Sequence, residues 1–176
     1  MTGNSSDPLT PILTRTSCRA FRPDPLPEAD LTRLIEALCR APSAGNVQPW
    51  RFIVVRSDGD REALAAAAHG QSFLARAPVV IVVCGDAARS EARYGKRGRD
   101  LYVIQDTAAA VENLLIAATA LGYGSCWVGA FDEKAAREAL GLPGGLRPLA
   151  MVPIGRPIRG RKPTGRRPKR EVVEIR

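Results

Sequence analysis

Side chains that could perform catalysis by themselves are few in this chain of 176 residues. The single histidine, His69, follows a run of alanines, and the sequence offers no obvious serine or cysteine partner for it to activate as a nucleophile. The four cysteines, at positions 18, 39, 84 and 126, form neither a CxxC pair nor a zinc-ligand pattern. We therefore expect no catalytic side chain and no metal site, and any chemistry should belong to a bound cofactor.

The segment "RTSCRAF" (15–21) carries the first group of side chains that could bind a ligand. Arg15, Ser17 and Arg19 occupy alternate positions, and alternate side chains of an extended backbone point to the same face. Two guanidinium groups and a hydroxyl on one face could bind one anion. An edge strand with a solvated basic face would show the same pattern, and the segment alone favours neither interpretation.

A second polar group lies in "PSAGNVQP" (42–49), between a helical pattern and a strand-like one. From Ser43 onward the segment has no side-chain periodicity, and its amide and hydroxyl groups could contact the polar edge of a flat heterocycle. A turn followed by a helix cap is the alternative. A third segment, "GYGSCWVGAF" (122–131), combines an apolar wall with small residues that allow close backbone approach, but it could equally be part of the core.

The C-terminal region is strongly basic and contributes much of the net charge of +8. Eight of the fifteen residues from 156 to 170 are Lys or Arg, and the prolines among them prevent a regular helix. The region is either a solvated tail or an anion-binding segment for a nucleic acid or for the phosphate of a small ligand. Because it has no aromatic residue for base stacking, we expect no nucleic acid as partner. The alternating "EVVEI" (171–175) that follows predicts a strand.

Composition and length predict one soluble domain over residues 1–176. The chain is 45% hydrophobic and 25% charged, and it has no apolar run long enough to cross a membrane. Its first ten residues are polar, which argues against a secretion signal. With cysteines that suit a reducing compartment, these features predict a cytoplasmic protein without a membrane partner.

The apolar periodicity predicts helices and strands that intermix around a small sheet, which is an α+β fold. Helices are expected over 28–41, 61–70, 100–121 and 132–143. Strands are expected over 51–56, 78–84 and 147–155, with a short strand or loop over 125–131. The helix over 100–121 is apolar nearly all round, which suggests the centre of the fold or a subunit contact. The segment 87–99 is expected to be a solvated loop, with a lid over a substrate pocket as the alternative.

Six segments in order resemble the nitroreductase family of FMN-dependent oxidoreductases, and together they cover nearly the whole chain. They are "RTSCRAF", "PSAGNVQPWRFIVV", "APVVIVVCGD", the stretch from "QDTAAAVENLL" to "AAREALGL", "PLAMVPIGRP", and the basic tail before "EVVEI". The resemblance implies a nitroreductase-like fold with a small, mostly antiparallel sheet flanked by helices. It also implies a homodimer with two FMN sites at its interface, each lined by both chains. The "EVVEI" strand would then be exchanged onto the sheet of the partner.

The resemblance assigns roles to particular residues around the flavin. Arg15, Ser17 and Arg19 match residues at the phosphate and the ribityl chain, and one of Arg166 and Arg167, with Arg166 favoured, matches a late phosphate-binding arginine. In the second segment, Pro42 and Ser43 would line the ring, Asn46 would bond its pyrimidine edge, and Gln48 belongs to the same polar set. In the third, Trp127 and Val128 would form a wall beside the ring, and Gly129 and Ala130 would present backbone N–H groups near flavin N5.

The reaction implied by the resemblance is transfer of hydride from NADH or NADPH to the flavin and then to an electron-poor acceptor such as a nitroaromatic or a quinone. Donor and acceptor would use one pocket in turn, which makes the mechanism ping-pong. The basic residues of segment 87–99 could attract the anionic donor. Two alternatives stay open: a flavin-binding relative with another chemistry (dehalogenation, flavin fragmentation or flavin storage), and a basic nucleic-acid-binding protein that uses its tail.

Overall fold

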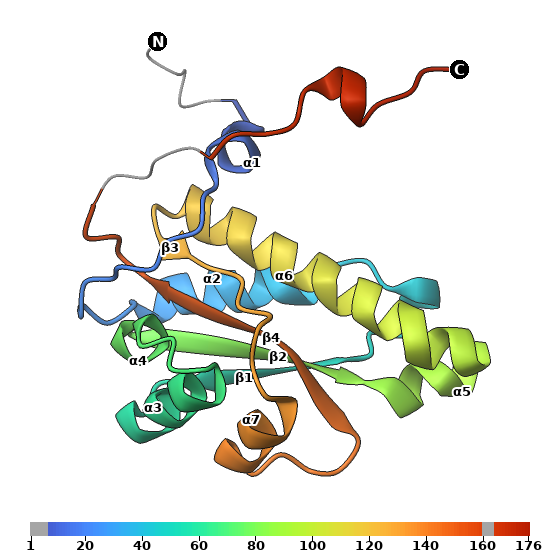
Figure 1. The fold of residues 1–176 in the computed structure, drawn as a ribbon, viewed down its shortest axis with the longest axis horizontal. Helices are drawn as coiled ribbons and strands as arrows, with labels where there is room; N and C mark the ends of the chain where they lie inside the picture. Colours follow the sequence, from blue (N-terminus) through green and yellow to red (C-terminus); the bar gives the residue numbers. More distant parts are fainter. Residues whose placement is uncertain (1–6, 160–163) are drawn as a thin grey trace.

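The computed structural model describes residues 7–159 and 164–176, and it shows helices on both faces of a four-stranded sheet (Figure 1). The α-helices are α1 (Thr10–Thr14), α2 (Glu28–Cys39), α3 (Asp58–Ala67), α4 (Phe73–Arg76), α5 (Ala87–Arg97), α6 (Val103–Ala120) and α7 (Glu133–Ala139). The strands are β1 (Trp50–Val55), β2 (Val79–Asp86), β3 (Gly124–Ser125) and β4 (Leu146–Gly155). Short 3₁₀ turns cover Ala44–Asn46 and Lys169–Glu171, and a π-helical turn covers Gly98–Tyr102.

The sheet is antiparallel throughout, with the strand order β1-β2-β4-β3, and its centre is β2. Every residue of β2 from Val79 to Gly85 is buried. A strand covered on both faces is apolar at every position rather than at every second one, which explains the run "VVIVVC". The expected α+β fold with a small antiparallel sheet and flanking helices is confirmed.

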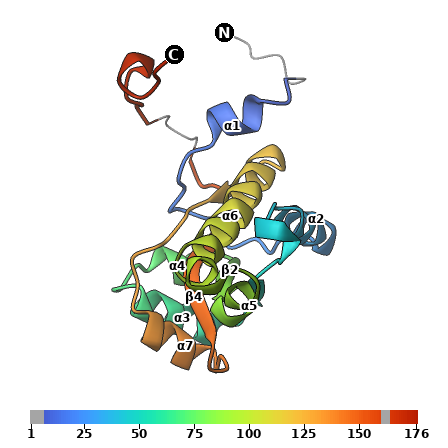
Figure 2. The ribbon, with the colours of Figure 1, turned by 90° about the vertical axis from the view of Figure 1, so that its right-hand side faces the viewer.

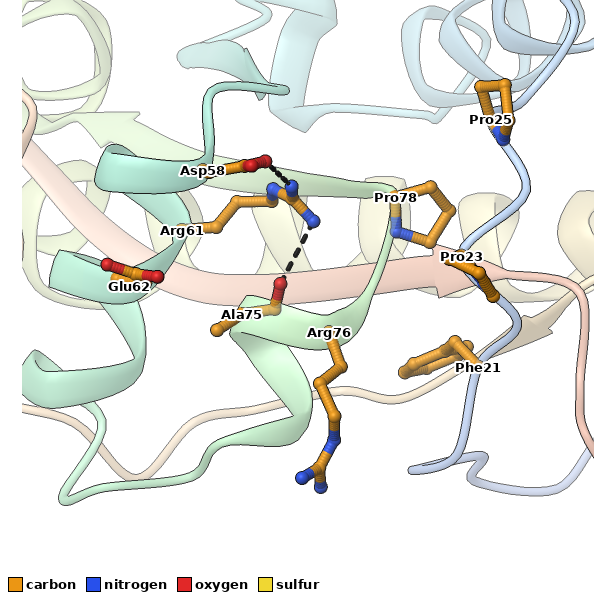
Figure 3. Close-up of a pocket in the computed structure, with 9 residues that line it drawn as sticks. All are labelled: Phe21, Pro23, Pro25, Asp58, Arg61, Glu62, Ala75, Arg76 and Pro78. Atoms are coloured by element: carbon orange, nitrogen blue, oxygen red, sulfur yellow. Dashed lines mark hydrogen bonds and ion pairs between the residues drawn. The ribbon is translucent and has the colours of Figure 1, made fainter.

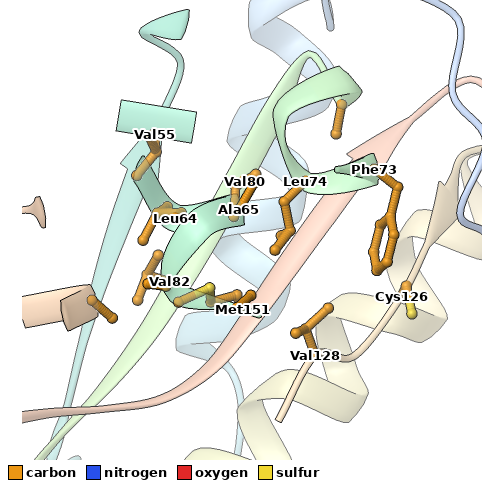
Figure 4. Packing of buried hydrophobic residues seen from close by; sticks show 14 of the residues in the cluster. Val55, Leu64, Ala65, Phe73, Leu74, Val80, Val82, Cys126, Val128 and Met151 are labelled. Carbon is orange, nitrogen blue, oxygen red and sulfur yellow. The ribbon is translucent and has the colours of Figure 1, made fainter. Parts of the chain in front are cut away.

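Alternate residues of the central strands enter two separate cores, because successive side chains of a strand point to opposite faces. Val80 and Val82, with Met151 of β4, pack against α3, α4 and α7 (Figure 4). Ile81 and Val83 pack on the other face, against α2 and α6. The molecule therefore has three layers, with the sheet in the middle.

Helix α6 runs across the sheet and contributes eight buried residues to the contact. By length and composition alone, the helical stretch 87–120 is the one candidate membrane span in the described part of the chain, against the expectation of none. A core helix of a soluble protein passes the same test. The burial of α6 against α2 and the sheet shows how its apolar side is used in this fold.

The segment 87–99, expected as a loop, is instead helical, and this expectation was wrong. Asp86 caps the first turn, where its carboxylate accepts a hydrogen bond from the backbone N–H of Arg89 at 3.0 Å. Most of the following residues favour a helix, so the cap is sufficient to start α5. Gly95, at φ 57° and ψ −148°, interrupts the helix before it continues through the π-helical turn into α6. The helix predicted from residue 100 thus begins earlier, and only its part from Val103 is α-helical.

Helix α1 and residues 164–176 project from the same side of the layered body (Figures 1 and 2). Residues 172–176 form no strand within the chain, so the exchange of "EVVEI" onto a partner stays a prediction. Large apolar side chains are exposed on both projections, including Leu13 of α1 at 73% and Ile175 at 93%. Such side chains are usual where a second protein surface covers them.

Shortening a buried side chain at the centre of α6 should strongly destabilise the fold. Leu114 is 0% exposed and lies between α2 and the sheet. Leu114→Ala should lower the free energy of unfolding by about 2–5 kcal/mol, since it leaves a cavity as well as losing buried apolar area. The control Ile158→Ala, at a side chain that is 54% exposed, should cost less than about 1 kcal/mol. Urea unfolding followed by circular dichroism measures both, and equal losses would contradict the assigned core.

Candidate functional site

Arg15, Ser17 and Arg19, called here the N-terminal cluster, gather around the thiol of Cys126. The segment pairs with β3 through a parallel bridge between Ser17 and Ser125, and the N–H of Cys18 donates to the Ser125 carbonyl at 2.8 Å. Burial raises the pKa of Cys126, while Arg19, the Ser17 hydroxyl and Arg15 each lower it. The bridge thus sets Ser17 beside Ser125, next to Cys126 in the chain, and the charges of both arginines act on the same thiol.

The cluster is cationic and open enough to receive an anion. Arg15 lies 3.6 Å from the carboxylate of Glu112 on α6, and its side chain is 22% exposed. The guanidinium of Arg19 stands 5.8 Å from the ring centroid of Phe73 and has no acidic partner among the described residues. Two guanidinium groups face one carboxylate here, so the site keeps an excess of positive charge. Charge-assisted donors of this kind are suited to a phosphate.

The 124–130 segment follows the outer edge of β4. The N–H and carbonyl of Val128 pair with Met151 at 2.9 and 3.0 Å, and the Val128 side chain is 3% exposed in the core. Because this pairing turns Val128 inward, the side chain available to form a wall beside a ring is that of Trp127, which is 40% exposed.

The next two residues of this segment offer backbone donors. Gly129 and Ala130 are both exposed, and neither N–H donates to an acceptor in the described part of the chain. The Ala130 carbonyl accepts a hydrogen bond from the side chain of Gln71 at 3.1 Å, which holds the turn in place. Fixed N–H groups that lack a protein partner can stabilise negative charge on a bound ligand.

The third group, residues 42–48, is called here the polar segment. Gly45, Asn46 and Gln48 all have positive φ, at 52°, 57° and 52°. Only a few non-glycine residues adopt this left-handed region, of which Asn is the most tolerant. The Ser43 hydroxyl accepts a hydrogen bond from the N–H of Gln48 at 2.9 Å, and the Gln48 amide donates to the Asn46 side-chain oxygen at 3.0 Å. Two exposed amide side chains are thereby held together at the surface.

The structure does not bring the polar segment and the N-terminal cluster together within one chain. The polar segment leads into β1, whose first residue Trp50 pairs with Gly85 at one end of β2. Ser125, beside the cluster, pairs with Ile154, which pairs with Val79 at the other end of β2. Six residues of strand separate these ends, or about 20 Å. Moreover, β1 and β3 are the two outer strands of the sheet, and both views show the two regions apart (Figures 1 and 2).

The two candidate arginines of the tail are bonded locally. Arg166 donates to the carbonyl and hydroxyl of Thr164 at 3.2 and 2.9 Å, and Arg167 lies 3.4 Å from the carboxylate of Glu171. Within the described residues, neither contacts the N-terminal cluster. Which of the two would meet a phosphate therefore stays as predicted from the sequence.

Three residues that support the polar segment were not assigned to it from the sequence, although Arg93 is one of the basic residues of segment 87–99 that were expected to attract the anionic donor. The carboxylate of Asp106, near the start of α6, accepts a hydrogen bond from the N–H of Ala44 at 3.0 Å. Arg89 and Arg93 of α5 donate to two of the segment's carbonyls. A signal for Asp106 did exist, since it is a lone acidic residue in the first half of an otherwise apolar helix.

A separate cleft of about 620 Å³ lies on another part of the surface, between helices α3 and α4 and the segment 21–25 (Figure 3). Arg61 crosses it, and its guanidinium is bonded to Asp58 and to the carbonyls of Ala75 and Ala77. None of the predicted site residues lines this cleft. Its central cation is already bound by the protein, so we do not assign the candidate site to it.

The buried carboxyl of Asp106 should make stability depend on pH. Burial raises its pKa above the ordinary value of 3.8, and the hydrogen bond from Ala44 only partly offsets this. The folded state therefore binds this proton more tightly than the unfolded chain does. The stabilisation that the protonated Asp106 carboxyl contributes is complete below pH about 3.8. It is lost as pH rises through the pKa of Asp106 in the folded protein.

Asp106→Asn removes this titration but keeps an oxygen that can accept from Ala44. The free energy of unfolding of the wild type, minus that of the variant, should fall as pH rises from about 3.5 to 7. Urea unfolding at several pH values measures this difference. The exposed Asp24→Asn serves as the control for the loss of one surface carboxylate. A difference that rises with pH would contradict the assignment.

Comparison with known proteins shows to which family this chain is similar. The family model described as "Nitroreductase family" matches residues 12–73 and 61–156. A protein of Thermus thermophilus named NADH dehydrogenase is 34% identical over 194 residues, which cover 95% of each chain. A 5,6-dimethylbenzimidazole synthase of Rhodobacter capsulatus is 32% identical over 178 residues, covering 86% of this chain and 84% of that protein.

The solved structures include the same fold. The nitroreductase family protein of Streptococcus pneumoniae superposes with a TM-score of 0.85 at 26% identity, covering 96% of this chain and 99% of that one. The family match spans most of the chain, from the N-terminal cluster to the end of β4. The resemblance found in the sequence is thus confirmed, and the chain belongs to the nitroreductase family of oxidoreductases.

Proposed function

We propose that the protein is a cytoplasmic, FMN-dependent oxidoreductase that carries hydride from NADH or NADPH to an electron-poor acceptor, a nitroaromatic or a quinone. The two half-reactions would use one pocket in turn. The observation that carries the proposal is the set of donors around Cys126 together with the unpaired N–H groups of Gly129 and Ala130. They offer cations for a phosphate and neutral donors for a ring that gains negative charge.

The residues present fit FMN in kind and in number. A phosphate monoester carries close to two negative charges at neutral pH and accepts several hydrogen bonds. Arg15 and Arg19 match its charge, and Ser17 adds a hydroxyl. When bound, FMN would supply the site at which hydride is accepted and released, which no side chain of this protein can offer. Asn46 and Gln48 would contact the polar edge of the ring, and the indole of Trp127 would cover part of its side.

We further propose that each site is completed by a second copy of the chain. The polar segment and the N-terminal cluster lie about 20 Å apart along the sheet, which is too far for both to hold one flavin from the same chain. A two-fold axis would set the polar segment of one copy beside the N-terminal cluster of the other, twice per dimer. The exposed apolar residues of α1 and the tail, Leu13 and Ile175 among them, would be covered in this arrangement.

The protein's own contribution to the reaction would be positioning and charge. The fixed N–H groups of Gly129 and Ala130 favour a negatively charged ring edge beside them, and they need no proton transfer to do so. The thiol of Cys126 stays neutral, because burial raises its pKa. Acceptor choice would depend on the space that remains above the ring. One relative is named as a 5,6-dimethylbenzimidazole synthase. The second candidate is therefore a flavin-binding protein with another chemistry, such as dehalogenation, flavin fragmentation or flavin storage.

The colour of the purified protein distinguishes the two candidate functions. The purified protein should be yellow or should become so on addition of FMN, and in the absence of air it should bleach when NADH or NADPH is added. Recovery of the colour on addition of a quinone would show the second half-reaction. A protein that binds FMN but does not bleach would favour the second candidate, and one that binds no flavin would overturn the proposal.

A complementation experiment tests whether two copies share each site. Arg15→Ala should weaken FMN binding by about tenfold, since a charge-assisted hydrogen bond is lost, and Asn46→Asp should weaken it by removing an amide donor while keeping the left-handed backbone. Co-expression of the two variants should give mixed dimers that carry one intact site each. About a quarter of all sites in the co-expressed mixture, and half of the sites in isolated mixed dimers, should then bind FMN as the wild type does.

Two controls define that experiment. Arg22→Ala removes an exposed cation of the same segment and should leave FMN affinity unchanged. Co-expression of Arg15→Ala with the double variant Arg15→Ala/Asn46→Asp offers no intact combination and should restore nothing. Fluorescence titration with FMN on mixed dimers isolated by two affinity tags measures the outcome. No recovery in those dimers would contradict a shared site.

A further inference from the structure

The polar segment has a left-handed backbone that local sequence preference explains at Gly45 and Asn46 but not at Gln48. Asn46 and Gln48 are both left-handed, and Gly45 before them is as well. A backbone of this kind persists only where the surrounding structure holds it, and such residues occur preferentially at ligand-binding sites. The contacts that hold this segment are therefore part of the site, even where they do not reach the ligand.

Two arginines of α5 supply those contacts. The Nε of Arg89 donates to the carbonyl of Val47 at 2.7 Å, and the Nη1 of Arg93 donates to the carbonyl of Gly45 at 2.8 Å. Residues four apart on a helix lie on the same face, so both guanidinium groups meet the segment from one side. They bind the carbonyls on either side of Asn46, whose own side chain is bonded to Gln48 and exposed.

These arginines differ from their neighbour Arg99, which is also exposed and basic. Arg99 forms ion pairs with Glu91 and Asp100, both at 2.9 Å. In the described part of the chain, neither Arg89 nor Arg93 forms an ion pair. Their guanidinium groups instead donate to backbone carbonyls of the polar segment, and that of Arg93 also lies 5.6 Å from the ring centroid of Tyr94.

The packing around Gly45 confirms how closely α5 covers the segment. A Cβ atom added to Gly45 would lie 2.2 Å from the Tyr94 hydroxyl and 2.8 Å from Cζ of Arg93. A side chain at this position would have to displace the Tyr94 hydroxyl and the Arg93 guanidinium. The contact between α5 and the polar segment is therefore tight at the point where the backbone turns left-handed.

We propose that Arg89 and Arg93 are positioning residues that hold the carbonyls of Val47 and Gly45, so that Asn46 is presented to the ring edge of a flavin. The inference rests on the proposed function, because it takes the flavin as the ligand of Asn46. It adds a role for α5 in cofactor binding. The arginines act through the backbone and do not contact the ligand, so their loss should alter flavin affinity and the flavin spectrum without removing a ligand contact.

The experiment compares Arg89→Gln, Arg93→Gln and the double variant with Lys96→Gln. Lys96 is an exposed cation of the same helix, so this control removes the same charge. Each Arg→Gln variant should bind FMN about tenfold more weakly, and the absorption bands of the bound flavin should shift. In the flavin-free protein, amide hydrogen exchange of the peptide that covers 42–48 should be faster than in the wild type. Lys96→Gln should match the wild type in all three measurements.

A second pair of variants tests the contact from the other side. Gly45→Ala should displace Tyr94 and Arg93 and reproduce the effects of Arg93→Gln. Gly141→Ala is its control, because Gly141 also has a positive φ, at 56°, but a Cβ atom there would meet nothing within 4 Å. Arg93→Lys keeps a donor that can reach the Gly45 carbonyl, and it should recover part of the lost affinity.

The outcomes separate this inference from the proposed function. Unchanged exchange of residues 42–48 in both arginine variants would overturn it, as would faster exchange with unchanged FMN affinity and spectrum. If the wild type binds no FMN, the proposed function fails and the flavin part of the inference fails with it. Hydrogen exchange on the flavin-free protein would then still show whether the arginines hold the segment.

Discussion

The burial of β2 on both faces is the constraint on which the rest of the structure depends. Val80 and Val82 pack against one layer of helices, and Ile81 and Val83 pack against the other. A strand enclosed in this way cannot present polar groups to a ligand without a large desolvation cost. Ligand-binding groups must therefore lie where the chain leaves the sheet. The polar segment precedes β1, and the 124–130 segment follows the outer edge of β4.

This placement explains why one chain alone makes an incomplete site. The two outer edges of a four-stranded sheet are separated by its whole width, and the two polar groups also lie near opposite ends of β2. In the proposed dimer, symmetry would supply what the single chain lacks. The exposed Leu13 and Ile175 fit such an arrangement, since large apolar side chains at the surface gain free energy when a second copy covers them.

The protein offers charge and geometry rather than reactive groups. Burial raises the pKa of Cys84 to about 11 and also raises that of Cys126, so neither thiol ionises readily at neutral pH. What the chain does provide is a set of donors in fixed places. Arg89 and Arg93 belong to this set, because they hold a strained backbone instead of forming ion pairs.

The sequence by itself determined the elements with strong apolar periodicity, the order of the motifs and hence the family, since these follow from local pattern. It predicted β1, β2, β4 and the main helices to within a few residues. It missed α5, which is rich in charged residues, buries only Ser90 and is broken at Gly95. Only the tertiary structure decided that Val128 turns into the core, that Asp106 meets Ala44 across 62 positions of sequence, and that the polar segment lies far from the N-terminal cluster. Such contacts depend on how whole layers pack, and no local pattern contains that information.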